Sequence, residues 1–298
     1  MWHDLAGQSS ATTRIDKRSQ GSLLTPEAQS AIQSFLQTVT GARESVLLLD
    51  YDGTLAPFHT QRDQAVPYPG IALLVQEIVR DARTRVIVIS GRDVTDLVPL
   101  LDIHPRPEIW GMHGFQRLGV DGTADMPKLD EQTLNALSDA ELWLSYKHLR
   151  HRAEFKSGGI AVHWRGLSAL DAAELRARVL LGWRPIIEQT GLNLLEFDGG
   201  IEIRAHRADK GAAVHALLRE ISIETPVACL GDDTTDESAF HALGDRGLSI
   251  LVRPEWRATS AQLWLKPPED VIDFLAGWLR SCREGNFGEG GVAQAVNE

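Results

Sequence analysis

The chain has 298 residues, of which 43% are hydrophobic and 24% are charged, so it can build one large globular domain or two modest ones. Its formal net charge is −11 and it has no long basic run, which argues against nucleic acid or an anionic membrane as a partner. The sequence shows no pattern of a secretory signal. We also expect no membrane span, because no apolar run reaches about 18 residues. Cys229 and Cys282 form no metal-binding or paired motif, and we therefore expect a cytoplasmic protein.

The first part of the chain is predicted to hold two parallel strands joined by a helix. Residues 1–24 are polar and aperiodic, which predicts a flexible arm. A Thr-Pro pair then indicates the start of a helix over 26–41. The next expected elements are a buried strand at 46–49, a helix at 70–82 and a second buried strand at 85–89. This order predicts a right-handed parallel crossover, so both strands should end at the same edge of one sheet.

Two carboxylates follow the first strand. Asp50 comes directly after four apolar residues, Asp52 is two positions later, and Gly53 lets the backbone turn. Two anions at the end of an apolar strand are costly without a cation, and Mg²⁺ prefers oxygen ligands of this kind. Asp50 could act as a nucleophile and Asp52 as an acid and base. Two solvated turn aspartates are the alternative.

A Ser-Gly-Arg triplet ends the second strand. The hydroxyl of Ser90 and the backbone freed by Gly91 suit a phosphate oxygen, and Arg92 could contact the substrate. Most such triplets are ordinary strand-to-helix turns. The prediction of a phosphate contact therefore depends on the position of this triplet at the end of the second parallel strand. A short helix is expected over 93–101, and His113 follows a further strand, either as a substrate contact or as a structural turn residue.

Residues 119–200 are predicted to form an α+β insertion of hairpins and helices. Two of its strands are joined by a Ser-Gly-Gly turn. Glu154 and Lys156 share one face of the first strand, and His163 and Arg165 share one face of the second. These four side chains could converge on a ligand, and a solvated sheet face explains the pattern equally well.

The parallel sheet is expected to resume near residue 201, and a helix should begin at Lys210. A lysine at a helix start is unfavourable for the helix dipole, which suggests a role in pairing with phosphate or with acidic side chains. A lone exposed lysine is the alternative. Later elements are expected as strands at 226–230 and 248–252, a helix at 269–282 and a flexible tail at 284–298.

A second group of carboxylates follows the strand at 226–230. Asp232 should reach the same sheet edge as Asp50 and supply a metal ligand, with Asp233 and Asp236 completing the surroundings of the metal. Acidic residues are also common at helix starts, where they complement the dipole. That alternative explains Asp236 better than the tight Gly-Asp-Asp sequence.

These features, in this order, resemble the haloacid-dehalogenase superfamily of phosphotransferases over roughly residues 44–280, and in detail they resemble the trehalose-6-phosphate phosphatases. The motifs that carry the resemblance are Leu49 to Pro57 (LDYDGTLAP), Glu154-x-Lys156 with His163-Trp164-Arg165, Glu202-Ile203-Arg204 with Lys210-Gly211, and Gly231 to Glu237 (GDDTTDE). The chain departs from the family at Phe197 and Asp198, where a Gly-Lys pair is usual, and at Ala205, where proline is usual.

The resemblance implies a Rossmann-like α/β core with an inserted α+β cap domain. The core would comprise residues 25–118 and 201–283, and the cap 119–200. Asp50 would be the nucleophile and Asp52 the acid and base, while Ser90 and Lys210 would hold the phosphate. Mg²⁺ would be bound by Asp50, the carbonyl of Asp52 and Asp232.

Further residues would contact the substrate, namely Gly91, Arg92, His113, Glu154, Lys156, His163, Arg165 and Glu202. The implied activity is hydrolysis of trehalose 6-phosphate through an aspartyl-phosphate, in trehalose biosynthesis. The alternatives are a phosphatase for sucrose, glucosylglycerol or glucosylglycerate phosphate, a sugar phosphomutase on the same scaffold, and a non-catalytic sugar-phosphate sensor. The expected partner is a small sugar phosphate, and a monomer is favoured.

Overall fold

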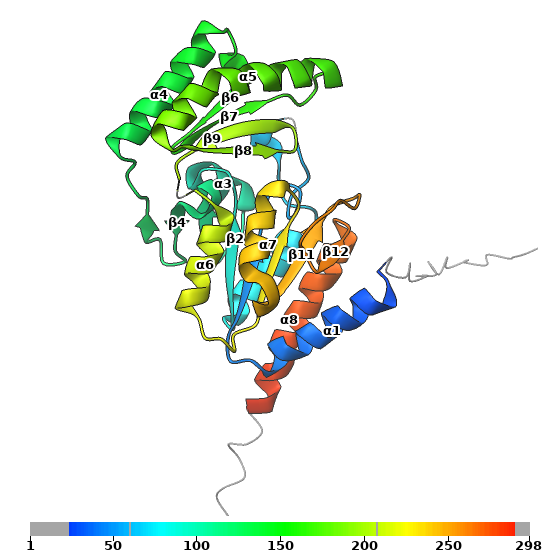
Figure 1. The fold of residues 1–298 in the computed structure, drawn as a ribbon. Coiled ribbons are helices and arrows are strands. Elements are labelled where there is room, and N and C mark those ends of the chain that lie inside the picture. Colours follow the sequence, from blue (N-terminus) through cyan, green and yellow to red (C-terminus); the bar gives the residue numbers. More distant parts are fainter. Residues whose placement is uncertain (1–23, 60, 207, 290–298) are drawn as a thin grey trace, which may run out of the picture.

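The computed structural model describes residues 24–59, 61–206 and 208–289, and its strands form two sheets (Figure 1). Residues 1–23 of the flexible arm predicted over 1–24, and residues 290–298 of the flexible tail predicted over 284–298, lie outside the described residues. The larger sheet has eight strands in the order β12-β11-β10-β1-β2-β3-β4-β5, and the smaller one has four in the order β6-β7-β9-β8. In the larger sheet the pairs from β12 to β3 are parallel, and β4 and β5 continue the edge as antiparallel strands.

The elements of the larger sheet and its helices are α1 (Pro26–Gly41), β1 (Ser45–Leu49), α2 (Ile71–Asp81), β2 (Thr84–Ile89), α3 (Val94–Leu101), β3 (Glu108–Gly111), β4 (Gln116–Leu118), β5 (Ala124–Asp125), α6 (Lys210–Glu220), β10 (Val227–Gly231), α7 (Glu237–Leu243), β11 (Leu248–Val252), β12 (Leu263–Leu265) and α8 (Glu269–Glu289). Those of the smaller sheet are α4 (Glu131–Tyr146), β6 (Ala153–Lys156), β7 (Gly159–His163), α5 (Ala169–Thr190), β8 (Asn193–Phe197) and β9 (Gly200–Arg204). Short 3₁₀ turns occupy 62–64, 112–114, 150–152, 234–236 and 244–246.

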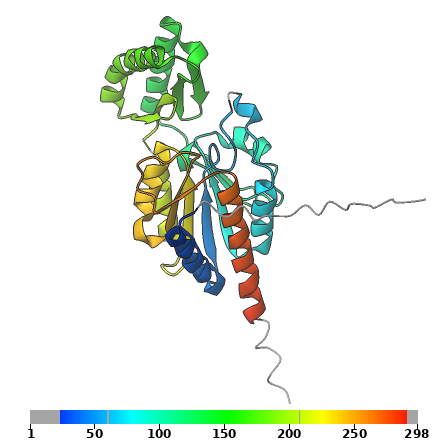
Figure 2. The ribbon, with the colours of Figure 1, turned by 90° about the vertical axis from the view of Figure 1, so that its right-hand side faces the viewer.

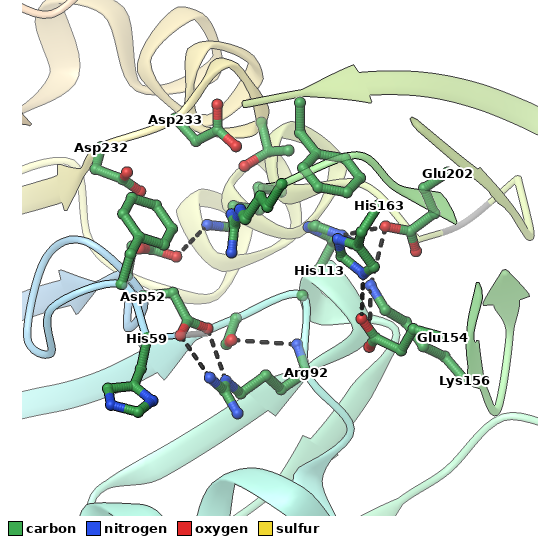
Figure 3. A pocket seen from close by; sticks show the side chains of 18 residues that line it. Asp52, His59, Arg92, His113, Glu154, Lys156, His163, Glu202, Asp232 and Asp233 are labelled. Carbon is green, nitrogen blue, oxygen red and sulfur yellow. Dashed lines mark hydrogen bonds and ion pairs between the residues drawn. The ribbon is translucent and has the colours of Figure 1, made fainter. Parts of the chain in front are cut away.

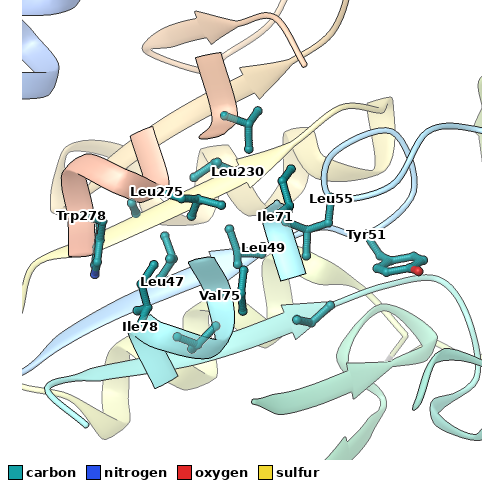
Figure 4. Close-up of a cluster of buried hydrophobic side chains, with 14 of the residues drawn as sticks. Leu47, Leu49, Tyr51, Leu55, Ile71, Val75, Ile78, Leu230, Leu275 and Trp278 are labelled. Atoms are coloured by element: carbon teal, nitrogen blue, oxygen red, sulfur yellow. The ribbon is translucent and has the colours of Figure 1, made fainter. Parts of the chain in front are cut away.

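The central strand β1 is buried on both faces because its side chains alternate between two hydrophobic layers. Leu47 and Leu49 pack with α2 and α8 on one face, as Figure 4 shows. Val46 and Leu48 pack with α6 and α7 on the other face. This double coverage is what a continuous apolar run in a parallel strand predicts, and the expected strand–helix–strand unit is confirmed.

The smaller sheet packs against α4 and α5, and we call this unit the cap. Its own hydrophobic cluster includes Leu144 from α4, Trp183 from α5 and Ile201 from β9. Figures 1 and 2 show the cap placed beyond one end of the strands of the larger sheet. None of the helices in the described ranges is long and apolar enough to cross a membrane.

Three expectations about boundaries are wrong. β5 pairs with β4, so the larger sheet continues past residue 119. β9 pairs with β7 and β8, with Ile201 opposite Val162, so the chain does not return to the larger sheet at 201. Helix α8 continues to Glu289, so the tail does not become irregular at 284. We therefore propose that the cap runs from the end of β5 to the end of β9.

Candidate active site

Three strands of the larger sheet bring polar residues to one edge. In the parallel register Leu49 lies opposite both Val88 and Leu230, so β1, β2 and β10 end side by side. Asp50 follows β1, and its backbone N–H donates to the carbonyl of Leu230 at 2.9 Å. Ser90 and Asp232 follow the other two strands. The prediction that these residues share one sheet edge is confirmed by the strand pairing.

Lys210 joins this edge from the first residue of α6. Its Nζ donates to Oδ1 of Asp50 at 2.5 Å and to Oδ1 of Asp236 at 2.6 Å, and its side chain is almost fully buried. Burial opposes the charged form, but the carboxylates of Asp236 and Asp50 outweigh it and hold the pKa of Lys210 above its usual range. The alternative of a lone exposed lysine is therefore wrong.

The carboxylates at this edge form a candidate cation site. Asp50, Asp232 and Asp236 each offer an oxygen, and these oxygens lie within 4.8 Å of one another. Oδ2 of Asp50 and Oδ2 of Asp232 are buried and have no hydrogen-bond partner among the described residues. Burial raises the pKa of Asp50, and burial together with the nearby Asp50 raises the pKa of Asp232. Unpartnered oxygens on destabilised anions fit a small divalent cation.

Asp236 and Asp233 are arranged differently from the expected metal ligands. Oδ2 of Asp236 accepts the backbone N–H groups of Asp232 and Asp233 at 3.0 Å each, so this side chain shapes the loop and anchors Lys210. The Asp233 carboxylate accepts the N–H of Thr234 at 2.6 Å and that of Asp198 from the cap at 3.2 Å. The Asp233 carboxylate therefore caps the 3₁₀ turn at 234–236 and also contacts the cap domain through Asp198.

Asp52 is held by a buried arginine. Nε and Nη2 of Arg92 donate to the two oxygens of Asp52 at 2.7 and 2.6 Å, and the Arg92 side chain is 4% exposed (Figure 3). The Arg92 N–H also donates to Oγ of Ser90 at 3.2 Å. Two parallel hydrogen bonds fix both the position and the plane of a carboxylate. The Ser-Gly-Arg turn thus positions Asp52 on the neighbouring loop.

Five ionisable side chains of the cap line the same pocket, and four of them form two ion pairs (Figure 3). Nζ of Lys156 lies 2.9 Å from Oε2 of Glu202, and Nε2 of His163 lies 2.9 Å from Oε2 of Glu154. The side chain of Glu202 is 2% exposed, that of Lys156 7% and that of Glu154 17%, so a solvated sheet face does not describe them. Burial opposes the charge on Glu202, but the nearby Lys156 outweighs it and holds the pKa of Glu202 below its usual range.

His113 reaches the same group from the larger sheet. Its backbone is left-handed, with φ 57°, and its Nε2 lies 3.6 Å from Oε2 of Glu202. Burial lowers the pKa of His113 to about 4, so the ring is neutral near pH 7. A Cβ on Gly91 would lie 2.8 Å from the His113 ring, which explains glycine at that position.

All of the predicted site residues except Asp236 line one pocket between the larger sheet and the cap, and Asp236 lies behind Lys210, to which it is hydrogen-bonded. Sequence reasoning missed four of the residues that line this pocket, namely Phe58, His59, Phe197 and Thr235. The Arg165 guanidinium lies 4.7 Å from the ring centre of Phe58 and donates to the carbonyl of Asp198. Phe58 and His59 directly follow the first carboxylate motif, and this proximity is the signal that could have found them.

The sequence model of the trehalose-phosphatase family matches residues 48–266. The chain is similar to the trehalose-phosphate phosphatase of Mycobacterium leprae (strain TN), with 30% identity over 269 residues, covering 82% of this chain and 59% of the relative. It spans about six-tenths of the length of the curated relatives it matches.

Solved structures show the same fold. The C-terminal domain of Candida albicans trehalose-6-phosphate phosphatase aligns with a TM-score of 0.71 at 20% identity, covering 84% of this chain and 96% of that one. A haloacid dehalogenase-like hydrolase from Bacteroides thetaiotaomicron aligns with a TM-score of 0.58 at 14% identity, covering 78% and 98%. The expected Rossmann-like core with an inserted cap is confirmed.

Proposed function

We propose that this chain, which belongs to the trehalose-phosphatase family, hydrolyses trehalose 6-phosphate to trehalose and phosphate. The observation that carries the proposal is the placement of Lys210 between Asp50 and Asp236, beside the unpartnered oxygen of Asp232. This arrangement suits phosphoryl transfer, which depends mainly on positioning and on charge neutralisation. The names of the matched relatives support the choice of substrate.

Mg²⁺ is the cofactor that best fits the acidic site. Asp50 and Asp232 would hold it through their unpartnered carboxylate oxygens, together with the backbone carbonyl of Asp52. When bound, it would neutralise the charge between the carboxylates and the substrate phosphate. Asp236 would keep the Asp232 loop and Lys210 in place without needing to be a ligand.

The reaction would proceed in two steps on the side chains of the chain itself. Asp50 attacks phosphorus, the bond to the sugar oxygen breaks, and Asp52, which must carry a proton for this step, gives it to that oxygen, which leaves an aspartyl-phosphate. Asp52 then takes a proton from water as the water attacks phosphorus, which releases phosphate and restores Asp50. Lys210 balances the anionic charge throughout, and the Ser90 hydroxyl donates to a phosphate oxygen.

The cap would bind the sugar. Glu154, Lys156, His163 and Glu202 present acceptors and donors to the pocket, as hydroxyl groups of a sugar require. Arg165 adds a cation at its rim. A site between cap and core also lets closure exclude water from the reacting phosphate.

A panel of sugar phosphates tests the proposal. Purified protein with Mg²⁺ should release phosphate from trehalose 6-phosphate at a kcat/KM at least ten-fold above that for sucrose, glucosylglycerol or glucosylglycerate phosphate. A preference for one of those esters would replace the substrate. Turnover that needs a sugar bisphosphate and yields an isomeric phosphate would indicate a mutase, and binding without turnover would indicate a sensor.

A further inference from the structure

Two turns of the cap touch the larger sheet. At the first, the Ser157 hydroxyl donates to Oδ1 of Asp93 at 2.7 Å, and the Ser157 N–H donates to Oδ2 at 3.2 Å. At the second, the turn between β8 and β9 meets the loop that follows β10 and carries Asp232. The second contact is richer and involves the candidate cation site.

The loop after β10 is held from two directions. Arg253 and Arg257, both from the segment after β11, donate to the carbonyl of Asp232, with Arg253 Nη1 at 3.2 Å. On the other side the loop contacts the cap, since the Asp233 carboxylate accepts the Asp198 N–H and the Thr234 hydroxyl donates to the Glu196 carbonyl at 3.1 Å.

Arg253 connects these two sets of contacts. While Nη1 binds the Asp232 carbonyl, Nη2 donates to Oδ2 of Asp198 at 3.0 Å. One guanidinium therefore joins the backbone of a proposed cation ligand to the core-facing turn of the cap.

We propose that Asp198 and Arg253 are positioning residues that couple closure of the cap to cation binding by Asp232. The proposal rests on the proposed function in taking Asp232 as a cation ligand. With the cap closed, Asp198 fixes Arg253, which fixes the backbone that aims the Asp232 carboxylate. A cation that orders this loop must, by linkage, favour the closed cap to the same extent.

Mn²⁺ binding to the substrate-free full chain tests this coupling without turnover. Electron paramagnetic resonance measures the concentration of free Mn²⁺ and so gives the Kd. Asp198→Lys places a like charge against Arg253 and should weaken Mn²⁺ binding about five-fold. Glu196→Lys is the matched control, because it makes the same charge reversal two residues away on β8, where Glu196 pairs with Arg176 at an exposed position. This control should stay within two-fold of the wild type.

An Arg253→Gln background separates the coupling from simple repulsion between the introduced lysine and the ion. Coupling through Arg253 predicts that Asp198→Lys changes Mn²⁺ affinity by less than two-fold in that background. An equal loss in both backgrounds, or no loss in either, would overturn the coupling. A wild-type protein that binds no Mn²⁺ would overturn the cation site of the proposed function as well, so the two failures are distinguishable.

Hydrogen exchange gives an independent measurement. Mg²⁺ should slow exchange of the Asp198 and Ser157 amides, which donate to Asp233 and Asp93, in the wild type and in Glu196→Lys. The same addition should leave these amides unchanged in Asp198→Lys. Exchange that is insensitive to Mg²⁺ in the wild type, despite measured binding, would reject the coupling.

Discussion

At the scale of single residues, the candidate site depends on buried charges whose partners come from distant segments. Asp50 and Lys210 are 160 positions apart, yet their side chains share a hydrogen bond of 2.5 Å. Asp52 and Arg92 lie on neighbouring loops and form two hydrogen bonds. Charged groups of this kind are retained against a desolvation cost, which is typical of functional sites.

The Arg92–Asp52 pair leads to a first prediction. Arg92→Lys keeps the charge but cannot make two parallel hydrogen bonds, so Asp52 should lose its fixed orientation and kcat should fall about 10- to 100-fold, with a smaller change in KM. Phosphate release from trehalose 6-phosphate measures both constants. Arg80→Lys, at an exposed ion pair with Glu77, is the control and should match the wild type. An unchanged kcat in Arg92→Lys would remove the positioning role.

Some of these residues could be predicted from the sequence because strand ends place them. Asp50, Ser90 and Asp232 each follow a buried parallel strand, and parallel strands end at one edge. The partner of Asp52 and the cap contact of Asp233 could not be predicted. These contacts depend on the geometry of turns, and turn sequences show no hydrophobic periodicity from which that geometry could be predicted.

At the scale of secondary-structure elements, the helices and the central strands follow from the sequence, and the assignment of strands to sheets does not. The sequence predicts that the larger sheet resumes near residue 201, but β9 pairs with β7 and β8 in the cap. β9 is buried along its whole length, with Ile201 and Ile203 in the hydrophobic cluster of the cap. The three-residue strand β12 and the short helix α7 were missed because they are too short to show a period.

The turn after β3 gives a second prediction, on pH. The buried His113 ring faces Glu202, Lys156 and Arg204, and burial lowers its pKa from the ordinary 6.5 to about 4. As the pH falls below 6.5, His113 takes up a proton in the unfolded chain but not in the folded chain, which favours unfolding. The free energy of unfolding is therefore unaffected by the protonation of His113 above pH 6.5 and decreases as the pH falls toward 4. At pH 5 the loss should be about 2 kcal/mol.

His113→Asn should remove that part of the pH dependence, because asparagine does not titrate and tolerates the left-handed backbone. Urea unfolding at pH 7.5 and pH 5 measures the difference in the free energy of unfolding. The control is His215→Asn, at an exposed position on α6, and it should keep the wild-type difference. The same pH dependence in His113→Asn and the wild type would show that His113 is not the source of the loss of stability at pH 5.

At the scale of the whole molecule, the larger sheet carries the residues that we propose to bind phosphate and cation, and the cap carries those that we propose to bind the sugar. The pocket lies between them, so neither unit forms it alone. Fold class and the existence of an inserted unit were predictable from the order of elements. The boundaries of the inserted unit were not predictable. β5 and β9 belong to one sheet or the other through their pairing partners, which the local sequence does not specify.

Cation binding gives a third prediction, on thermal stability. Mg²⁺ at about 100 times its Kd should raise the Tm of the whole chain by about 5 °C, since it satisfies buried oxygens in the folded state alone. Asp232→Asn should lose most of this rise. Asp233→Asn should keep it, because the Asp233 carboxylate contacts Thr234 and Asp198. Differential scanning calorimetry with and without Mg²⁺ checks both, and the reverse pattern would make Asp233 the ligand.

The central claim is that Asp50 receives the phosphoryl group, and mass spectrometry of acid-quenched enzyme tests it most directly. After rapid mixing with trehalose 6-phosphate and Mg²⁺, wild-type enzyme quenched during turnover should carry phosphate on the peptide that contains Asp50. The Asp50→Asn variant should carry none and should release phosphate at least 1,000-fold more slowly than the wild type. Phosphate found on Ser90, or normal turnover by Asp50→Asn, would contradict the account.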